Sequence, residues 1–265
     1  MARVEKYTAE SVYNQFRHNT RETANPPINV EINPQRTHLN YSLIPHGNTA
    51  KECYTYYKQR LSEVYLYGNR AVNTMAQWII TAPADLTKEQ EKAFFEAATD
   101  YCNSLYGERN ACQAVVHMDE GVKNSEGDIV AGRPHLHYSF IPVVKNSRYM
   151  KPNSYGNITN IASYEEKVCS NDLINKTHLK RWHIDFQTFL DKRGIRCSVI
   201  TGVTSGGNRT VAELKSRTKI ELLTKEKEKL KQQIKDLENS KERSNSPWTH
   251  TAGWSKGEKS WEKDY

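Results

Sequence analysis

The fold of this chain is most plainly encoded in residues 133–140, whose sequence is RPHLHYSF. Side chains two residues apart in a β-strand point to the same face of the sheet. A strand over these residues therefore turns His135, His137 and Ser139 to one face and turns Leu136, together with the aromatic residues that alternate with it, toward the core. This alternation predicts a sheet that is apolar on one face and carries a pair of imidazoles on the other.

Similar short runs of β-branched and aromatic residues, bounded by turn residues, recur along the chain. They predict strands at residues 39–44, 72–81, 111–118, 135–144 and 196–200. Apolar residues at helical spacing predict helices at residues 50–67, 87–105 and 176–192. A capping-box pattern opens the second helix at Thr87, and Gly194 follows the third. The order of these elements predicts an α+β fold in which helices pack on a face of the sheet.

Composition narrows the class of protein. The 265 residues include 38 Lys and Arg against 31 Asp and Glu, a formal net charge of +7, which favours a polyanionic partner. Hydrophobic residues make up 37% and charged residues 26%, as expected of a soluble folded protein, which we expect in the cytoplasm. No apolar stretch approaches the ~18–20 residues that span a bilayer, so we expect no membrane insertion. The five cysteines form no CxxC pair, which argues against a disulfide framework or a cysteine zinc site.

The amino-acid composition of the chain changes near residue 211. Residues 1–210 are predicted to form one domain, residues 211–243 a charged amphipathic helix, and residues 244–265 a flexible tail. Within the helix, apolar residues follow the a/d spacing of a coiled coil for about two and a half heptads. The sequence leaves two alternatives open for it, a solvated helix and a stalk that forms a homodimer.

A third histidine lies in residues 117–120, whose sequence is HMDE. His117 ends the predicted strand 111–118, where it can meet His135 and His137 on one cation. Three neutral imidazoles leave coordination positions open for water and a phosphate oxygen, as a catalytic metal requires. A lone histidine is more often a hydrogen-bonded or surface residue, but three at strand ends beside Asp119 and Glu120 favour a metal site. By ligand type alone, zinc or another transition metal is preferred to magnesium.

Two strings near the N-terminus complete the pattern. Residues 18–21 are HNTR, and residues 33–41 are NPQRTHLNY. The first is a polar turn after a short helix. The second predicts a turn that leads into a strand, in which Tyr41 is a core aromatic by its alternation alone.

Taken in this order, HNTR, NPQRTHLNY and HMDE followed by PHLH resemble the Mob/Pre (plasmid mobilisation and recombination, MobV-type) family of relaxases. The resemblance continues through the string LKRWHIDFQ at residues 179–187 and covers about residues 1 to 240. It implies the palm of the histidine-hydrophobe-histidine (HUH) relaxases and replication initiators, which is a mostly antiparallel central sheet with helices packed on it. It also implies an enzyme that nicks one strand of plasmid DNA at an origin of transfer, stays attached to the 5′ phosphate, and can rejoin the ends.

The resemblance also implies roles for single residues. The nucleophile is the histidine of HNTR, His18, and Tyr41 remains a second candidate because most other relaxases use a tyrosine. Glu120 corresponds to the acidic residue of the active site and could stabilise the positive charge that develops on His18. Arg21 could bind the phosphate or the departing 3′ oxygen.

The metal triad of the family corresponds to His117, His135 and His137. Because the family is associated with manganese or magnesium, we expect Mn²⁺, with Mg²⁺ as the alternative; manganese accepts imidazole and serves phosphate chemistry. The expected partners are plasmid DNA, single-stranded or supercoiled at the origin of transfer, and a coupling protein of a transfer apparatus. DNA contacts are predicted for Asn33, Arg36 and Asn40.

One departure from the family pattern concerns residues 121–133, which separate Glu120 from Pro134 where relatives have only a few residues. This stretch predicts a hairpin with a turn at residues 124–127. Paired flanking strands would keep His117 beside His135, whereas the position of Glu120 is the part that the insertion puts in doubt.

Two other functions fit parts of the sequence. A rolling-circle replication initiator with the same metal site would use a tyrosine on a helix after HxH, and Tyr164 in the YxxK string at residues 164–167 fits that pattern. A non-catalytic DNA-binding module with a structural zinc is the third alternative, although such sites are usually rich in cysteine.

Overall fold

The computed structural model describes residues 2–22, 32–68, 71–123, 129–200 and 211–244. Contacts divide the chain into two compact units, residues 1–219 and residues 220–265. The first unit contains the sheet and the helices that cover it. The second contains most of one long helix.

A five-stranded sheet forms the centre of the first unit, in the order β1-β3-β7-β4-β2. The strands are β1 (Ala2–Thr8), β3 (Asn73–Thr81), β7 (His135–Phe140), β4 (Ala111–His117) and β2 (Tyr41–Ser42). Every neighbouring pair is antiparallel. The predicted α+β fold with a mostly antiparallel sheet is confirmed.

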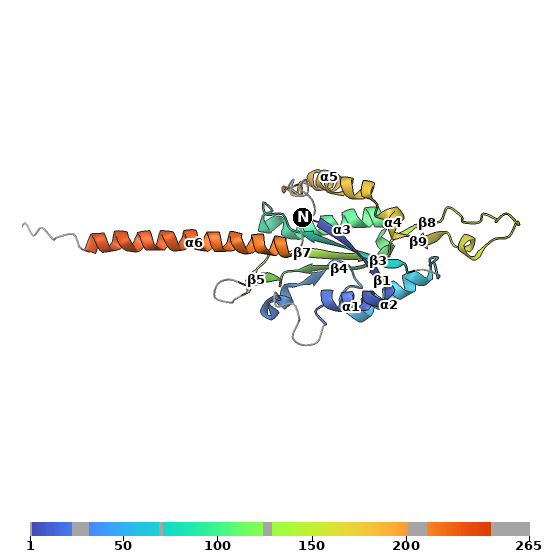
Figure 1. The fold of residues 1–265 in the computed structure, drawn as a ribbon, viewed down its shortest axis with the longest axis horizontal. Helices are drawn as coiled ribbons and strands as arrows, with labels where there is room; N and C mark the ends of the chain where they lie inside the picture. Colours follow the sequence, from blue (N-terminus) through green and yellow to red (C-terminus); the bar gives the residue numbers. More distant parts are fainter. Residues whose placement is uncertain (1, 23–31, 69–70, 124–128, 201–210, 245–265) are drawn as a thin grey trace, which may run out of the picture. The chain divides into compact units, whose positions relative to one another are not determined.

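Helices cover both faces of this sheet (Figure 1). On one face lie α3 (Lys88–Tyr106) and α5 (Lys176–Lys192), and on the other lie α1 (Ala9–Asn19) and α2 (Ala50–Ser62). The α3 and α5 face encloses the larger core, in which the rings of Trp78 and Trp182 stack with centroids 4.2 Å apart. The α1 and α2 face has a smaller core, and it leaves room at one end for polar side chains.

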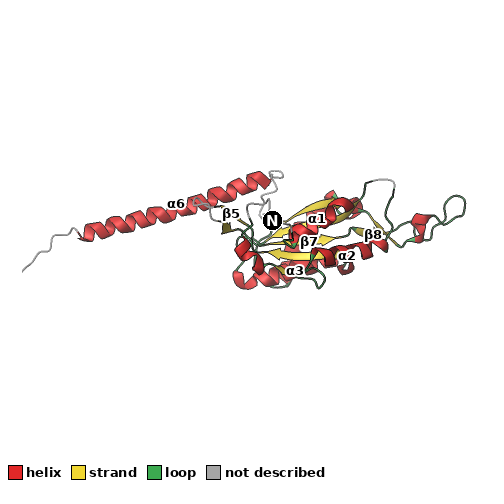
Figure 2. Cartoon of the chain, turned by 90° about the horizontal axis from the view of Figure 1, so that it is seen from below, coloured by secondary structure: helices red, strands yellow, loops and turns green. Residues whose placement is uncertain are grey.

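Shorter elements complete the first unit. They include the hairpin β5 (Gly121–Lys123) and β6 (Ile129–Ala131), the pair β8 (Val143–Lys145) and β9 (Glu166–Val168), and helix α4 (Ser170–Leu173). Strands β5 and β8 are labelled at opposite ends of the sheet in Figure 2. Three 3-10 helices complete the set: η1 (Pro34–Leu39), η2 (Glu108–Asn110) and η3 (Asn160–Ser163). The predicted hairpin in residues 121–133 is therefore present, while its turn lies outside the described residues.

Several predicted boundaries were wrong. The strand predicted at residues 39–44 is reduced to β2, because Pro34 opens a 3-10 helix that continues to Leu39. No strand forms at residues 196–200, and the strand predicted at residues 135–144 is interrupted at residues 141–142 between β7 and β8. Strand β1 was missed, since only some of its residues are apolar or β-branched.

The helix ends also differ in detail. Helix α2 ends at Ser62 rather than at residue 67. Thr87 is the N-cap of α3 but its side chain makes no capping hydrogen bond, whereas Thr49 and Glu52 form a complete capping box at α2. Helix α5 ends as predicted, with Gly194 at a φ of 71° just beyond it.

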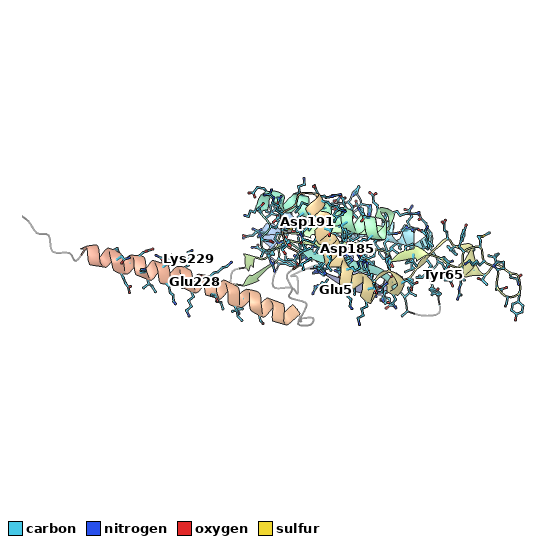
Figure 3. The ribbon with its side chains drawn as sticks, turned by 90° about the horizontal axis from the view of Figure 1, so that it is seen from above. Glu5, Tyr65, Asp185, Asp191, Glu228 and Lys229 are labelled. Atoms are coloured by element: carbon cyan, nitrogen blue, oxygen red, sulfur yellow. The ribbon has the colours of Figure 1, made fainter. Side chains whose placement is uncertain are left out.

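The long helix α6 spans Val211–Ser244. Its described apolar side chains are exposed: Ile220, Leu223, Leu230, Ile234 and Leu237. Glu228 and Lys229 also project from this helix without a covering element in the second unit (Figure 3). Among the described residues, no helix is both long and apolar enough to cross a membrane.

Candidate metal centre and nucleophile

Three histidines meet on the α1 and α2 face of the sheet. His117 at the end of β4 lies directly opposite His135 at the start of β7, and His137 follows two residues later on the same face. The ring centroids of these histidines are 4.5 to 5.3 Å apart. The pairing register therefore brings together the residues that the HxH pattern and His117 predicted.

Glu120 completes the cluster. One of its carboxylate oxygens, Oε1, lies 3.5 Å from Nδ1 of His117, and the other, Oε2, lies 3.5 Å from Nε2 of His135. One potential ligand atom from each of the four residues lies within 4.8 Å of the other three. The insertion does not displace Glu120, because the hairpin closes beside it: the Gly132 N–H donates to the Glu120 carbonyl at 2.8 Å.

The protonation states of these groups suit metal binding. Burial lowers the pKa of His135 to about 4 and the pKa of His137 well below its usual value, so both rings are neutral near pH 7. Burial alone would raise the pKa of Glu120, but the adjoining His117, His135 and Arg21 side chains outweigh it and hold that pKa well below its usual range. Imidazole nitrogens and one carboxylate form a donor set that accepts a divalent transition metal.

The ring nitrogens also show where a cation fits. Nε2 of His117 lies 2.8 Å from the Asn19 carbonyl oxygen, which accepts its proton, so the Nδ1 lone pair faces the cluster and accepts a hydrogen bond from the Arg21 guanidinium at 3.0 Å. Nε2 of His137 is buried without any hydrogen-bond partner. A buried polar atom of this kind costs free energy unless something binds it, so the residues present fit a metal ion.

His18 lies next to the cluster, in the last turn of α1. Its ring centroid is 6.4 Å from that of His117 and 6.3 Å from that of His137. Burial and the adjacent Arg21 guanidinium lower the pKa of His18, so the imidazole is neutral and has a free lone pair near pH 7. A neutral imidazole is the form that can act as a nucleophile.

Arg21 has a different environment from the one predicted. Helix α1 ends at Asn19, and Arg21 follows it in a turn with a φ of 61°. Its guanidinium binds both carboxylate oxygens of Asp119 at 2.7 and 3.0 Å and also binds Glu120 at 2.8 Å. The side chain is 8% exposed, so the guanidinium is engaged inside the protein.

Tyr41 lies away from the cluster. It is paired with Val116, whose side chain belongs to the core under α3, whereas the neighbouring His117 points to the opposite face. Burial and the carboxylates of Glu91 and Glu96 on α3 raise the pKa of Tyr41 to about 12. The structure therefore does not bring this hydroxyl together with the three histidines.

Tyr164, the tyrosine of the YxxK string, is not on a helix. It follows η3 and precedes β9, and its ring packs 5.9 Å from that of Tyr65. Strand β9 pairs with β8, and β8 follows Phe140, which is at the other end of β7 from His135. The helical tyrosine of an initiator is thus absent from residues 164–167.

The residues predicted to contact DNA hold η1 against the end of β4. The Asn33 side chain accepts from the backbone N–H of Gln35, Arg36 donates to the Met118 carbonyl at 3.1 Å, and Asn40 accepts from the Met118 N–H at 2.7 Å. Each side chain thus has a partner within the protein. Their contacts with DNA stay a prediction.

The sequence reasoning missed a row of buried amides beneath the histidines. Gln77 and Gln113 are fully buried in the sheet, and Asn19 is 1% exposed. Both glutamines interrupt apolar runs in predicted strands, at positions that face the same side as His137. A polar residue inside a strand that is otherwise buried was the signal that could have found them.

An antiparallel sheet with an HxH strand, a third histidine opposite it and a fourth on an adjoining helix defines a fold and site of the relaxase class. The chain belongs to the plasmid recombination enzyme family (Mob/Pre), whose model matches residues 1–196.

Individual relatives agree with this assignment. A plasmid recombination enzyme of Streptococcus agalactiae is 29% identical over 227 residues, which are 81% of this chain and 38% of that protein. One from Lactiplantibacillus plantarum is 32% identical over 154 residues, 54% of this chain and 37% of that protein. The chain therefore spans less than half the length of these curated relatives.

Among solved structures, the chain is similar to the Mn-bound MobM relaxase domain in complex with oriT DNA of plasmid pMV158. That likeness has a TM-score of 0.59 and 27% identity, and it covers 82% of this chain and 97% of the MobM chain. A second Mn-bound MobM complex, at pH 4.6, has a TM-score of 0.56 at the same identity.

Proposed function

We propose that this chain is a plasmid mobilisation relaxase that nicks and rejoins one DNA strand at an origin of transfer, with His18 as the nucleophile. The observation that carries the proposal is the proximity of a neutral histidine to a buried cluster of three histidines and Glu120. Membership of the plasmid recombination enzyme family supports it.

In the proposed reaction, an unprotonated ring nitrogen of His18 attacks the scissile phosphorus in line with the 3′ oxygen. A P–N bond forms and the P–O3′ bond breaks; the 3′ oxygen takes up a proton and leaves as a hydroxyl, while the 5′ phosphate stays on His18. Because the P–N bond retains the energy of the broken ester, attack by a 3′ hydroxyl reverses the step. Mn²⁺ held by His117, His135 and His137 would orient the phosphate and withdraw its charge.

The remaining site residues have electrostatic and positioning roles in this proposal. The ionised Glu120 balances the positive charge that develops on His18 during attack. Arg21 holds the turn after α1 in place through its ion pair with Asp119. This pairing positions His18 relative to the cluster. The phosphate contact of Arg21 stays a prediction.

Support for the metal and the DNA comes from the relatives. The MobM relaxase domain is Mn-bound and bound to oriT DNA, and this chain has a cluster of three histidines and Glu120 that could hold a metal ion. We infer Mn²⁺ as the cofactor, with Mg²⁺ as the alternative, and plasmid origin DNA, single-stranded or supercoiled, as the substrate. The net charge of +7 favours such a polyanion.

The test is covalent trapping. The protein is incubated with Mn²⁺ and labelled single-stranded oligonucleotides from its own plasmid, and wild type is compared with His18→Ala, Tyr41→Phe and Tyr164→Phe. We expect an adduct that is labile in acid and stable in alkali, as a phosphoramidate is, and that is lost only in His18→Ala. An acid-stable adduct that survives in His18→Ala would refute the histidine mechanism.

Two further partners belong to this proposal. The exposed apolar residues of α6 fit a parallel or antiparallel pair of helices, so we infer a homodimer through residues 211–243. Sedimentation of the chain with and without Leu230→Lys and Ile234→Lys tests it, and a monomer in both cases would exclude the dimer. A coupling protein in the cytoplasm of a bacterial host is the other inferred partner, and co-purification with that protein from a mobilising host would test it.

A further inference from the structure

The buried amides link the helix of His18 to the metal ligands. The Asn19 amide lies 3.1 Å from the Gln77 carboxamide and 2.7 Å from that of Gln113. Gln77 in turn lies 2.6 Å from Nδ1 of His137 and 3.1 Å from the Ser139 hydroxyl. All of these groups are shielded from water, so each hydrogen bond constrains the next.

Whether Gln77 donates or accepts a hydrogen bond depends on which ring nitrogen of His137 carries the proton. In the structure the amide nitrogen of Gln77 donates to Nδ1, so a neutral His137 carries its own proton on Nε2. That Nε2 atom is the one without a partner. A protonated nitrogen cannot bind a metal, so a cation at Nε2 requires the proton on Nδ1 and the Gln77 oxygen turned to accept it.

His117 is fixed by the same helix. Its Nε2 proton is donated to the Asn19 carbonyl, while the Asn19 side chain binds Gln77. Asn19, which follows His18, thus binds the ligand His117 directly through its backbone carbonyl and binds Gln77, the partner of the ligand His137, through its side chain.

We propose that Gln77 and Asn19 are positioning residues of the metal centre: the Gln77 oxygen holds His137 as the Nδ1–H tautomer, and Asn19 ties both ligands to the helix of His18. This inference rests on the proposed metal site, and it assigns residues outside the four ligands. Partners that orient ligand histidines in this way typically account for about 10–100-fold in metal affinity.

The rest of the row can follow the rotation of Gln77. In the rearranged row the Asn19 side chain also turns, so that Gln77 and Gln113 both donate to its oxygen and Gln77 donates to Ser139 as well. Gln15, whose amide donates to the Asn19 oxygen at 3.1 Å in the structure, turns its own oxygen to accept from the Asn19 nitrogen. The Gln113 oxygen then faces Cys53, whose sulfur lies 3.4 Å from the Gln113 amide. Burial raises the pKa of Cys53 to about 12, so its thiol keeps the proton that it would donate. Every buried group keeps a partner in both arrangements.

The experiment compares Gln77→Leu, Gln77→Glu and the control Thr74→Val. Thr74 is on the same strand, is 2% exposed and accepts a hydrogen bond from Tyr57. Thr74→Val therefore reports the effect of removing a buried hydrogen bond that does not involve a metal ligand. Mn²⁺ affinity is measured by electron paramagnetic resonance. The tautomer of His137 is read by ¹⁵N NMR in metal-free protein and with diamagnetic Zn²⁺, whose competition with Mn²⁺ verifies the shared site.

We expect Gln77→Leu to weaken Mn²⁺ binding by about 10–100-fold, and both Gln77→Glu and Thr74→Val to bind near the wild-type level, since a carboxylate also accepts the Nδ1 proton. In wild type we expect Nδ1–H on His137 with Zn²⁺ bound. Unchanged affinity in Gln77→Leu, or a Zn²⁺ form without a proton on Nδ1, would overturn the positioning role alone. Wild-type protein that binds no metal would overturn the metal site as well. If Gln77→Leu does not fold, the wild-type NMR result decides.

Discussion

Arg21 and Asp119 form a buried bidentate ion pair, with Nη2 to Oδ1 at 2.7 Å and Nε to Oδ2 at 3.0 Å. The Asp119 side chain is fully buried, and its carboxylate also accepts from the Thr37 hydroxyl at 3.0 Å. This one pair joins three segments: the turn after α1, η1, and the end of β4. The proposed nucleophile and the proposed metal ligands therefore share a support formed by two residues that are 98 positions apart in the sequence.

Breaking this pair should destabilise the protein strongly. Arg21→Leu leaves the Asp119 carboxylate buried and unpaired, and we expect a loss of about 3–5 kcal/mol in the free energy of unfolding, measured in urea. Arg193→Leu is the control: Arg193 binds Asp100 at 2.6 Å with both side chains largely exposed, and such pairs contribute about 0–1 kcal/mol. Equal losses in the two variants would contradict the structural role of Arg21.

Each proposed ligand should be required for metal binding. We expect His117→Ala, His135→Ala and His137→Ala each to weaken Mn²⁺ binding by at least the ~10–100-fold effect of a supporting residue, because each removes a donor atom directly. The exposed His38 provides a control as His38→Ala, which should bind Mn²⁺ as wild type does. Titration followed by electron paramagnetic resonance measures the affinity, and a ligand variant with wild-type affinity would remove that residue from the site.

The metal-free protein should lose stability as pH falls. The pKa of His135 is about 4 in the folded protein because the ring is buried, against an ordinary value of 6.5. Between these values the unfolded chain binds a proton that the folded chain does not. The free energy of unfolding is therefore unaffected by this proton uptake above about pH 6.5, and it falls progressively as the pH decreases from about 6.5 to about 4.

Urea unfolding in EDTA from about pH 7 to about pH 5 measures this slope. His135→Gln should show a shallower fall than wild type, since one proton uptake is removed. His18 and His137, whose pKa values burial also lowers, preserve part of the slope. An identical slope in wild type and His135→Gln would show that His135 does not titrate as stated.

Gly132 should be needed for the position of Glu120. A Cβ atom there would lie 2.9 Å from the Glu120 carbonyl oxygen and 3.3 Å from Gly121 Cα, both backbone atoms at the base of the hairpin. We expect Gly132→Ala to shift Glu120 and weaken Mn²⁺ binding while the three histidines stay in place. Gly68→Ala is the control, because a Cβ atom at Gly68 meets nothing within 4 Å. Equal affinity in the two variants would contradict the prediction.

Much of the sheet and its coverings could be predicted from the sequence. The alternation in residues 133–140 predicted both faces of β7, and helical spacing predicted α3 and α5. These features depend on short-range periodicity, which a strand or helix must obey whatever it packs against. The wrong boundaries lie where the chain is irregular: the 3-10 helix η1 replaced a strand because Pro34 and local hydrogen bonds decided the backbone there.

The features of the candidate site likewise separate into those that the sequence predicted and those that depend on tertiary contacts. By itself, the sequence determined that three imidazoles gather, because alternation along two strands turns them to one face, and the family resemblance added the histidine of HNTR; the position of Glu120 stayed open. Only the tertiary structure decided that Tyr41 lies on the opposite face, that Arg21 is paired with Asp119, and that Asn19 and Gln77 support the ligands. The physical reason is that these relationships depend on pairings between segments about 60 to 100 residues apart, and local pattern carries no information on which buried polar groups will satisfy one another.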